Sequence, residues 1–178
     1  MSSPIIATTI SELHKVKRLA EKAIDQLDEQ QLWHRLDPES NSVAVIMRHM
    51  AGNMRSRWTD FRTTDGEKPD RHRDQEFEDK TLTREALMAE WEDGWRRVFS
   101  ALEAVRDDEL QAIVMIREEP HTIYQAIVRQ IAHYAGHVYQ ILAFAKHMKG
   151  AGWQTLSVPR GKSEEFNQQM LARRRAAR

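Results

Sequence analysis

The sequence predicts an all-α protein, a four-helix bundle with a short additional helix at its C-terminus. Four long segments carry apolar residues at three- and four-residue steps, which is the spacing of helices with one buried face. No convincing run alternates apolar and polar residues as a half-buried strand does. Because 178 residues is the length of one ordinary domain, we expect a single domain over residues 1–178.

The first two predicted helices lie on either side of a loop at Pro38. The first helix covers roughly residues 6–30, where apolar side chains recur at helical intervals. The second helix begins at Asn41 or Ser42, since both residues are good N-caps, and it continues to about Phe61.

A long polar connection separates the second predicted helix from the third. It covers residues 63–80, and a connection of this length in a compact domain is often functional. Thr83 is the predicted N-cap of the third helix, with Leu82 and Leu87 placed as a hydrophobic staple. We expect this helix to end near Arg106.

The fourth predicted helix is the longest and follows an ambiguous segment. Residues 110–118 could form a short extended piece before a break at Pro120, but so short an apolar run does not separate strand from helix. Thr122 and Gln125 then form a capping box that opens the fourth helix. It is expected to end near Lys149, before two glycines.

The balance of charges in the chain argues against nucleic acid as the main ligand. The 27 basic and 27 acidic side chains balance, whereas phosphate binding needs a clustered basic surface. The one basic cluster, Arg173 to Arg175, lies in the predicted helical tail of residues 163–178, where a solvated helix end explains it.

Further absences narrow the class of protein. The chain has no cysteine, so a disulfide, a thiolate nucleophile and a Cys-ligated metal are all excluded. The N-terminal residues lack the pattern of a secretion signal, and no window reaches the roughly eighteen apolar residues of a membrane span. We therefore expect a cytoplasmic protein that does not bind membranes.

Two histidines stand four residues apart in the fourth helix, within the sequence RQIAHYAGHVYQI. His133 and His137 lie on the same face at this spacing, close enough to bind one ion, although eight histidines in the chain make such a pair a common coincidence. A projection at about 100° per residue places them beside the main apolar stripe, which favours a cleft or a second buried surface. That predicted stripe consists of Ile127, Ile131, Ala135, Val138, Leu142 and Ala145.

His49 is the best candidate for a third ligand. It lies on the second helix beside the apolar stripe, on the same flank as Asn53 and Ser56. If the second and fourth helices face each other, the three imidazoles converge. Three neutral imidazoles suit Zn, Ni, Cu or Fe(II) and leave a coordination position open, at which a bound water or thiol becomes more acidic. The spacing of these residues is also compatible with histidines that bind no metal and are simply exposed or have a structural role.

Other catalytic motifs are missing. Tyr134 stands in HYAGH where a zinc protease carries its glutamate base. The GKS sequence at 161–163 lacks the earlier glycine of a P-loop, and no preceding strand is predicted. The chain also lacks the two helical E-x-x-H motifs of di-iron bundles and a G-x-S-x-G nucleophile motif.

Over nearly its whole length the chain resembles the DinB-like (YfiT-like) metalloenzymes, and more closely an uncharacterised branch of them. The resemblance rests on NSVAVIMRHMAGNMRSRWTDFRTTDGEKP, HTIYQAIVRQIAHYAGHVYQI and TLSVPRGKSEEFN. It implies an up-down-down-up four-helix bundle, frequently dimeric, with a divalent metal bound by one histidine of the second helix and an H-x-x-x-H pair of the fourth. In this chain the matching positions are His49, His133 and His137, and we expect Zn or Ni.

The resemblance also implies a chemistry. Some relatives are thiol-dependent S-transferases or isomerases that use the metal to hold a low-molecular-weight thiol as its thiolate. That use of an external thiol suits a chain without cysteine, because thiolate is the nucleophile and a metal favours it at neutral pH. The resemblance identifies neither the thiol nor the electrophile. Arg57, Arg73 and Arg160 are candidates for contacting the substrate, but none matches a known position.

Three hypotheses for the function follow from the sequence. The first is a metal-dependent thiol S-transferase or hydrolase that acts on a small molecule, with the connection 63–80 helping to close the site. The second is a non-catalytic, dimeric stress or interaction protein, and the third is a small-molecule sensor that uses the same cavity. A homodimer is expected because apolar or small residues occupy more than half of the circumference of the fourth helix.

Overall fold

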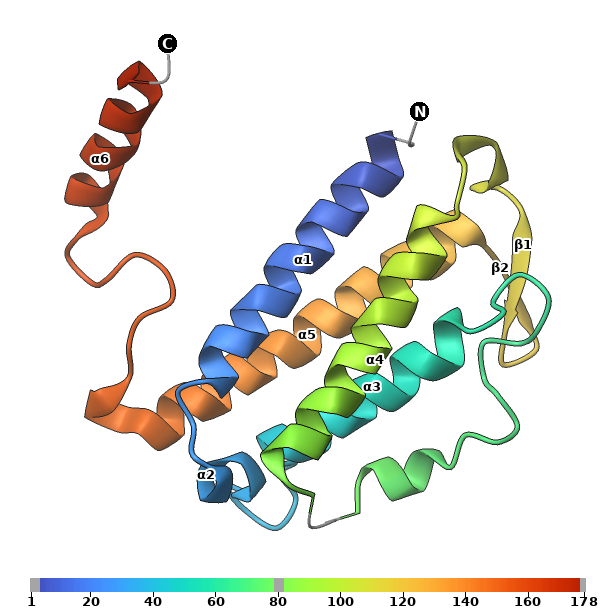
Figure 1. Ribbon diagram of the computed structural model, residues 1–178, viewed down its shortest axis with the longest axis horizontal. Helices are drawn as coiled ribbons and strands as arrows, with labels where there is room; N and C mark the ends of the chain where they lie inside the picture. The colour runs from blue at the N-terminus through green and yellow to red at the C-terminus, as the bar shows by residue number, and fades with distance from the viewer. Residues whose placement is uncertain (1–3, 79–81, 177–178) are drawn as a thin grey trace.

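The computed structural model describes residues 4–78 and 82–176, and these residues are mostly helical (Figure 1). Residues 79 and 80 of the predicted connection and residues 177 and 178 of the predicted tail lie outside the described residues. The four long helices are α1 (Pro4–Ile24), α3 (Val43–Trp58), α4 (Arg84–Glu103) and α5 (Ile123–Lys149). The shorter elements are α2 (Glu29–Trp33), η1 (Arg73–Glu76), η2 (Asp107–Glu109), β1 (Ile113–Ile116), β2 (Glu119–Thr122), η3 (Gly150–Gly152) and α6 (Ser163–Ala176).

Side-chain caps account for most of the helix starts. Ser42 accepts a hydrogen bond from the backbone N–H of Val45, and Thr83 accepts one from the N–H of Ala86. The predicted capping box of Thr122 and Gln125 is present, with both reciprocal hydrogen bonds formed (2.8 and 3.0 Å). These local signals lie within a few residues of each other, so the sequence was enough to predict them.

The first predicted helix, over residues 6–30, is wrong at its C-terminal end. Helix α1 stops at Ile24, and α2 begins separately after Asp28. The cause is a capping box, in which the Asp28 carboxylate accepts from the Gln31 N–H and the Gln31 side chain accepts from the Asp28 N–H (2.8 and 3.1 Å). A strong N-cap in the middle of a helical pattern starts a new helix.

The expected break at Pro120 is also wrong, because Pro120 lies within strand β2. Strands β1 and β2 pair antiparallel, with Ile113 opposite Thr122 and Ile116 opposite Glu119. Arg117 and Glu118 form the two-residue turn, and both have positive φ (56° and 63°), as in the primed turns that match strand twist. The Asp65 carboxylate accepts hydrogen bonds from the backbone N–H groups of both turn residues (2.8 Å each). Asp65 belongs to the long connection of residues 63–80, and this connection therefore holds the hairpin in place.

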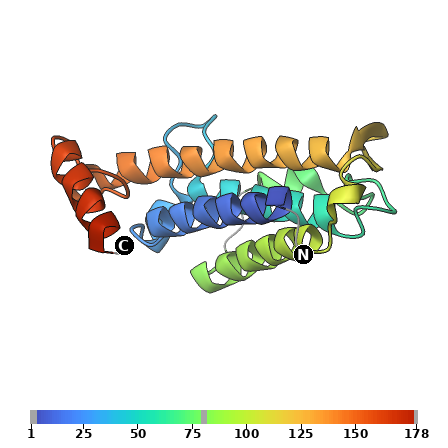
Figure 2. The same cartoon turned by 90° about the horizontal axis from the view of Figure 1, so that it is seen from above.

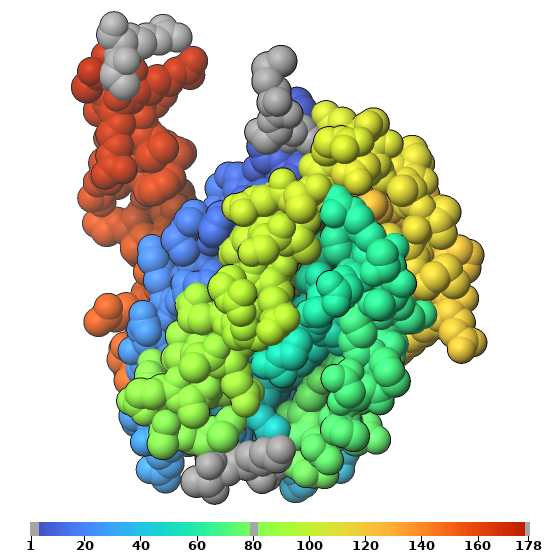
Figure 3. All heavy atoms as spheres, turned by 45° about the vertical axis from the view of Figure 1, so that its right-hand side comes forward, coloured from blue at the N-terminus to red at the C-terminus, as the bar shows by residue number. Residues whose placement is uncertain are grey.

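Helix α3 lies at the centre of the packed helices. It packs against α4, α5, α2 and η1, and 14 of its 16 residues are buried, with Arg55 as its one exposed residue. Figure 3 shows the connection, coloured teal to green, along the side of the molecule next to α4. The connection covers the polar flank of α3, and this is why the flank is buried. From the sequence, the same flank was expected only to lie at the edge of an apolar stripe.

The buried stripe of α5 is rotated from its predicted position. Ile131, Ala135 and Leu142 are only half-buried, whereas Tyr134 and Ile141 are fully buried. Tyr134 lies outside the predicted stripe, and a buried tyrosine hydroxyl needs hydrogen-bond partners. The structure supplies them, since the hydroxyl accepts from Trp58 Nε1 (2.9 Å) and donates to Asn53 Oδ1 (3.3 Å).

Helix α6 begins at Ser163, as predicted, and lies apart from the other helices at one end of the molecule (Figures 1 and 2). All of its described side chains are exposed. Within the described part of the chain, none of the helices combines the length and apolar character that crossing a membrane requires.

Helices α3 and α4 approach closely at Gly94, which yields a test of the packing. A Cβ on Gly94 would lie 3.0 Å from the Ala51 Cα atom, so we expect Gly94→Ala to lower the free energy of unfolding by about 1–3 kcal/mol. Gly136→Ala on α5 is the matched control, because its Cβ would meet nothing within 4 Å. It should stabilise the helix by up to about 1 kcal/mol. Urea unfolding of both variants measures the difference, and equal effects would contradict this packing.

Candidate metal site

The structure brings together the three histidines predicted from the sequence. His49 comes from α3, and His133 and His137 come from neighbouring turns of α5. One ligand atom from each residue lies within 4.8 Å of those of the other two, close enough to hold a metal ion. The Nε2 atoms of His133 and His137 are 3.1 Å apart. Two nitrogens bound to one tetrahedral zinc ion are about 3.3 Å apart, so the donor set fits such an ion.

Hydrogen bonds to the outer nitrogens orient two of these rings. The Nδ1 atom of His49 lies 2.9 Å from Glu76 Oε2, and that of His137 lies 3.0 Å from Gln140 Oε1. A ligating histidine usually donates its second N–H in this way, which leaves Nε2 free for the metal. The Nδ1 atom of His133 is buried and has no hydrogen-bond partner among the described residues.

Glu76 belongs to η1, in the connection between α3 and α4. Its place at the site was not predicted from the sequence. Its carboxylate accepts two hydrogen bonds from Arg71 (2.8 Å each) in addition to its contact with His49. Gly52 permits this approach, because a Cβ at that position would clash with Glu76 Oε1. The only signal in the sequence was a polar connection of unusual length, and it could not identify which carboxylate turns inward.

The connection is fixed to α3 by a second arginine. Arg48 donates hydrogen bonds to the backbone carbonyls of Gln75 (2.8 Å) and Glu78 (2.6 Å), on either side of Glu76. Ser56 donates to the carbonyl of Gly66 (2.7 Å) at the start of the same segment. The polar residues of α3 thus hold the backbone that carries Glu76.

The surroundings of His133 and His137 favour the neutral form of the imidazole, which is the form that binds metals. Burial, helped by the nearby His137 and His49, lowers the pKa of His133 to about 3. Burial also lowers the pKa of His137. Burial alone would raise the pKa of Glu76, but hydrogen bonds from His49 and Arg71 outweigh it and lower the pKa overall. His133 and His137 are therefore in the protonation state that metal binding requires.

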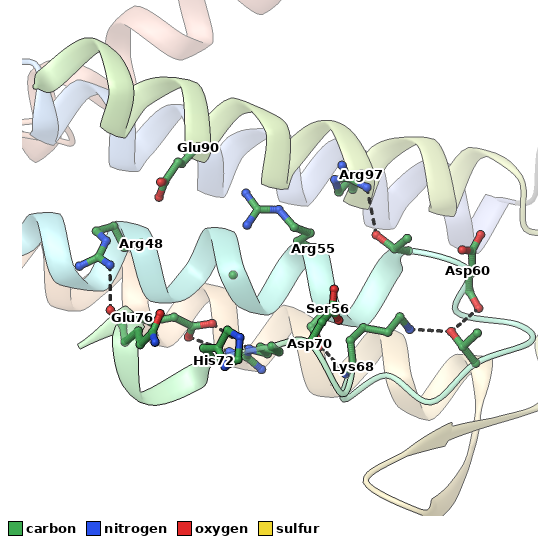
Figure 4. A pocket seen from close by; sticks show the side chains of 15 residues that line it. Arg48, Arg55, Ser56, Asp60, Lys68, Asp70, His72, Glu76, Glu90 and Arg97 are labelled. Carbon is green, nitrogen blue, oxygen red and sulfur yellow. Dashed lines mark hydrogen bonds and ion pairs between the residues drawn. The ribbon is translucent and has the colours of Figure 1, made fainter. Parts of the chain in front are cut away.

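Two cavities flank the site. A cavity of about 340 Å³ is lined by His49 and His133 together with several arginines. A larger one, of about 650 Å³, lies between α3, α4 and the connection, and it contains none of the three clustered histidines. Figure 4 shows acidic and basic side chains around the larger cavity, including Glu76 and Arg48. The smaller cavity is the one that reaches the candidate metal ligands.

Residues 1–162 match the model of a family described as "Protein of unknown function (DUF1572)". The chain belongs to this family. The match includes the three clustered histidines of the DUF1572 chain and Glu76, and it ends immediately before α6. No curated protein matches the chain.

The arginines named in the sequence analysis fall in different places. Arg57 and Arg73 line the smaller cavity, beside the clustered histidines. Arg160 is exposed in the segment that precedes α6. Arg71, Arg117 and Arg129 also line the smaller cavity, and none of them was identified from the sequence, because none belongs to a motif and Arg117 lies in an unpredicted hairpin turn.

The contact between Glu76 and His49 can be tested by its effect on metal affinity. Glu76→Gln keeps the shape of the side chain but removes the charge that orients His49, so we expect the affinity for Zn²⁺ or Ni²⁺ to fall about 10- to 100-fold. Competition with a chromophoric chelator measures this affinity. Glu90→Gln is the control, because Glu90 lines the larger cavity away from the histidines. Wild-type affinity in Glu76→Gln would contradict the orienting role.

Glu67 provides a test of the ion pairs by pH. Burial raises its pKa, but Arg71, Arg57 and Arg117 lower it more, so the pKa lies below the usual 4.5. The unfolded chain therefore takes up a proton near pH 4.5 while the folded protein resists it, and stability is lost as the pH falls further. We expect Glu67→Gln to cost about 1–2 kcal/mol at pH 7. In urea unfolding its difference from wild type should shrink below about pH 4.5, and a difference independent of pH would contradict this.

Proposed function

We propose that this DUF1572 protein is a divalent-metal-dependent enzyme that acts on small molecules, with His49, His133 and His137 as the metal ligands. The observation that carries the proposal is the convergence of three imidazoles from two helices, two of them oriented by hydrogen bonds at their outer nitrogens. Structural zinc sites are usually closed by four protein ligands, whereas catalytic sites keep three and leave one position open. The cluster of three therefore favours catalysis.

The proposed chemistry is transfer or hydrolysis. When bound, a Zn²⁺ or Ni²⁺ ion would supply Lewis acidity that lowers the pKa of a thiol or water at neutral pH. His49 is held for this role by Glu76, and burial keeps His133 unprotonated. The resemblance to DinB-like enzymes and the lack of cysteine support a low-molecular-weight thiol as cosubstrate, and hydrolysis is the alternative.

The proposal extends to the bundle topology and the assembly. Helices α1 and α5 run opposite to α3 and α4 in Figure 1, which supports the up-down-down-up order of the DinB-like bundle. Tyr124, Val128 and Tyr139 of α5 are exposed, which supports a homodimer through the outer face of that helix. The cytoplasmic location expected from the sequence stays a prediction.

Metal analysis of protein purified without a histidine tag tests the proposed function. We expect about one Zn²⁺ or Ni²⁺ per chain, and loss of that metal in His133→Ala combined with His137→Ala. His147→Ala is the matched control, because it removes an exposed histidine from the same helix. Wild type without stoichiometric metal, or a double variant with as much as wild type, would contradict the proposal.

Thermal unfolding separates the enzyme from a non-catalytic bundle. A metal that binds only the folded protein adds about 2.7 kcal/mol at 100 times its Kd, which corresponds to a Tm increase of roughly 5–10 °C. A non-catalytic bundle without a metal site predicts a Tm that is indifferent to chelator and added metal. Turnover by the metal-loaded protein with a panel of thiols and electrophiles then distinguishes an enzyme from a sensor, which binds its ligand without converting it.

A further inference from the structure

The cavity of about 340 Å³ beside the histidine cluster is strongly basic. Among the residues that the structure describes, five arginines line it and no acidic side chain does. They come from four parts of the fold: Arg57 from α3, Arg71 and Arg73 from the connection and η1, Arg117 from the hairpin turn, and Arg129 from α5. Its volume is that of a small-molecule site.

The carboxylates near these arginines do not balance their charge. Glu67 accepts from Arg57 (3.0 Å), Arg71 (3.3 Å) and Arg117 (3.1 Å), and Glu76 accepts from Arg71, so these two carboxylates serve three guanidinium groups. Two more arginines line the cavity, which leaves an excess of 5 − 2 = 3 positive charges.

The charges of the two remaining arginines, Arg73 and Arg129, are balanced least by nearby carboxylates. Arg73 lies 3.9 Å from the fully exposed Asp74 and stacks over Phe77, and Arg129 has no ion-pair partner among the described residues. Asp65 is also nearby and holds the hairpin turn. Counting Asp65 and Asp74 as well still leaves 5 − 4 = 1 positive charge before any metal is added.

Buried polar atoms in the same cavity have no hydrogen-bond partner among the described residues. They are Arg57 Nε, Gln130 Oε1 and His133 Nδ1, and Gln130 is only 4% exposed. Half a turn of the Gln130 amide exchanges its oxygen for a donor nitrogen. Arg57, Gln130 and neutral His133 can therefore all offer N–H groups, and buried donors require acceptors.

We propose that this cavity binds an oxyanion, a carboxylate or a phosphate group of the substrate, and so holds the substrate beside the histidine cluster. The exposed Arg117 and Arg129 attract the anion at the rim, and Arg57 and His133 donate to it further in. The larger cavity is not a comparable site, because Asp60, Asp70, Glu76 and Glu90 line it together with its basic residues. The inference names the substrate class of the metal enzyme and rests on that proposed function.

The probes for the test are inorganic phosphate and succinate, with uncharged succinamide as the neutral comparison. Each is titrated at low ionic strength into wild-type protein, both metal-free and metal-loaded, and calorimetry and Tm report binding. We expect phosphate or succinate, but not succinamide, to bind saturably and to raise Tm. Raising the salt to about 0.15 M should weaken binding, since partly exposed arginines are screened.

Paired variants locate the binding. Arg117→Gln with Arg129→Gln removes the rim charges while leaving the buried Arg57 and Arg71 to hold the fold, and it should weaken anion binding about tenfold or more. Arg18→Gln with Arg160→Gln is the control, because it removes two exposed arginines outside the cavity and should change affinity less than twofold. Binding of phosphate alone or of succinate alone identifies the anion that the site prefers.

The outcomes separate the two proposals. Absence of anion binding in protein that binds metal, or equal affinity in wild type and the rim variant, overturns the anion site and leaves the metal enzyme standing. Anion binding that depends on the rim arginines in protein that binds no metal supports the anion site and overturns the metal enzyme. Metal content is therefore measured on the same preparations.

Discussion

The buried polar flank of α3 is the constraint on which the rest of the site depends. Because α3 is enclosed by α4, α5 and the connection, each polar group on it must be hydrogen-bonded by a neighbouring segment or lose stability. Arg48 and Ser56 meet this need through backbone carbonyls of the connection, and His49 meets it through Glu76. The same hydrogen bonds that stabilise the fold therefore fix the connection against the helix and set the ring of His49.

This arrangement makes the candidate metal site rigid before any metal binds. His133 and His137 share one face of a continuous helix, so their relative position is set by helical geometry. His49 comes from a second helix, but its ring is held between Glu76 and the edges of the other two imidazoles, with ring centroids 5.5 and 5.0 Å away. Because the ligands are already oriented, little conformational freedom is lost on binding.

Local spacing explains which parts of the structure the sequence could predict. The caps at Ser42, Thr83 and Thr122 and the histidine pair depend on residues within one helical turn. Helical periodicity placed His49 beside the apolar stripe of its own helix, but only the structure brings it to the pair. The order of the four long helices came only from the family resemblance. Periodicity does not reveal which residue of an irregular segment turns inward, and so Glu76 was missed.

Tyr134 and the hairpin show the second limit, which is tertiary context. A tyrosine in a helix is ranked as partly polar, yet Tyr134 is fully buried because Trp58 and Asn53 are positioned to bond its hydroxyl. Strand β2 contains Pro120 and is mostly exposed, so its sequence carries little strand signal, and it forms because the Arg117–Glu118 turn is held by Asp65 from another part of the chain. Both features depend on contacts between residues more than 50 positions apart.

A continuous series of ion pairs connects the hairpin to the candidate metal ligands. Arg117 donates to Glu67, Glu67 also accepts from Arg71, and Arg71 forms a two-point contact with Glu76, which bonds His49. A substitution at the basic cavity and a substitution at the histidines therefore both affect the same ion pairs, those of Glu67, Arg71 and Glu76. An anion in the cavity and a cation at the histidines attract each other, and by thermodynamic linkage each strengthens binding of the other by the same factor. The arginine cluster and the histidine cluster thus form one electrostatic unit, in which Glu67 and Glu76 hold the guanidinium groups in place without neutralising them.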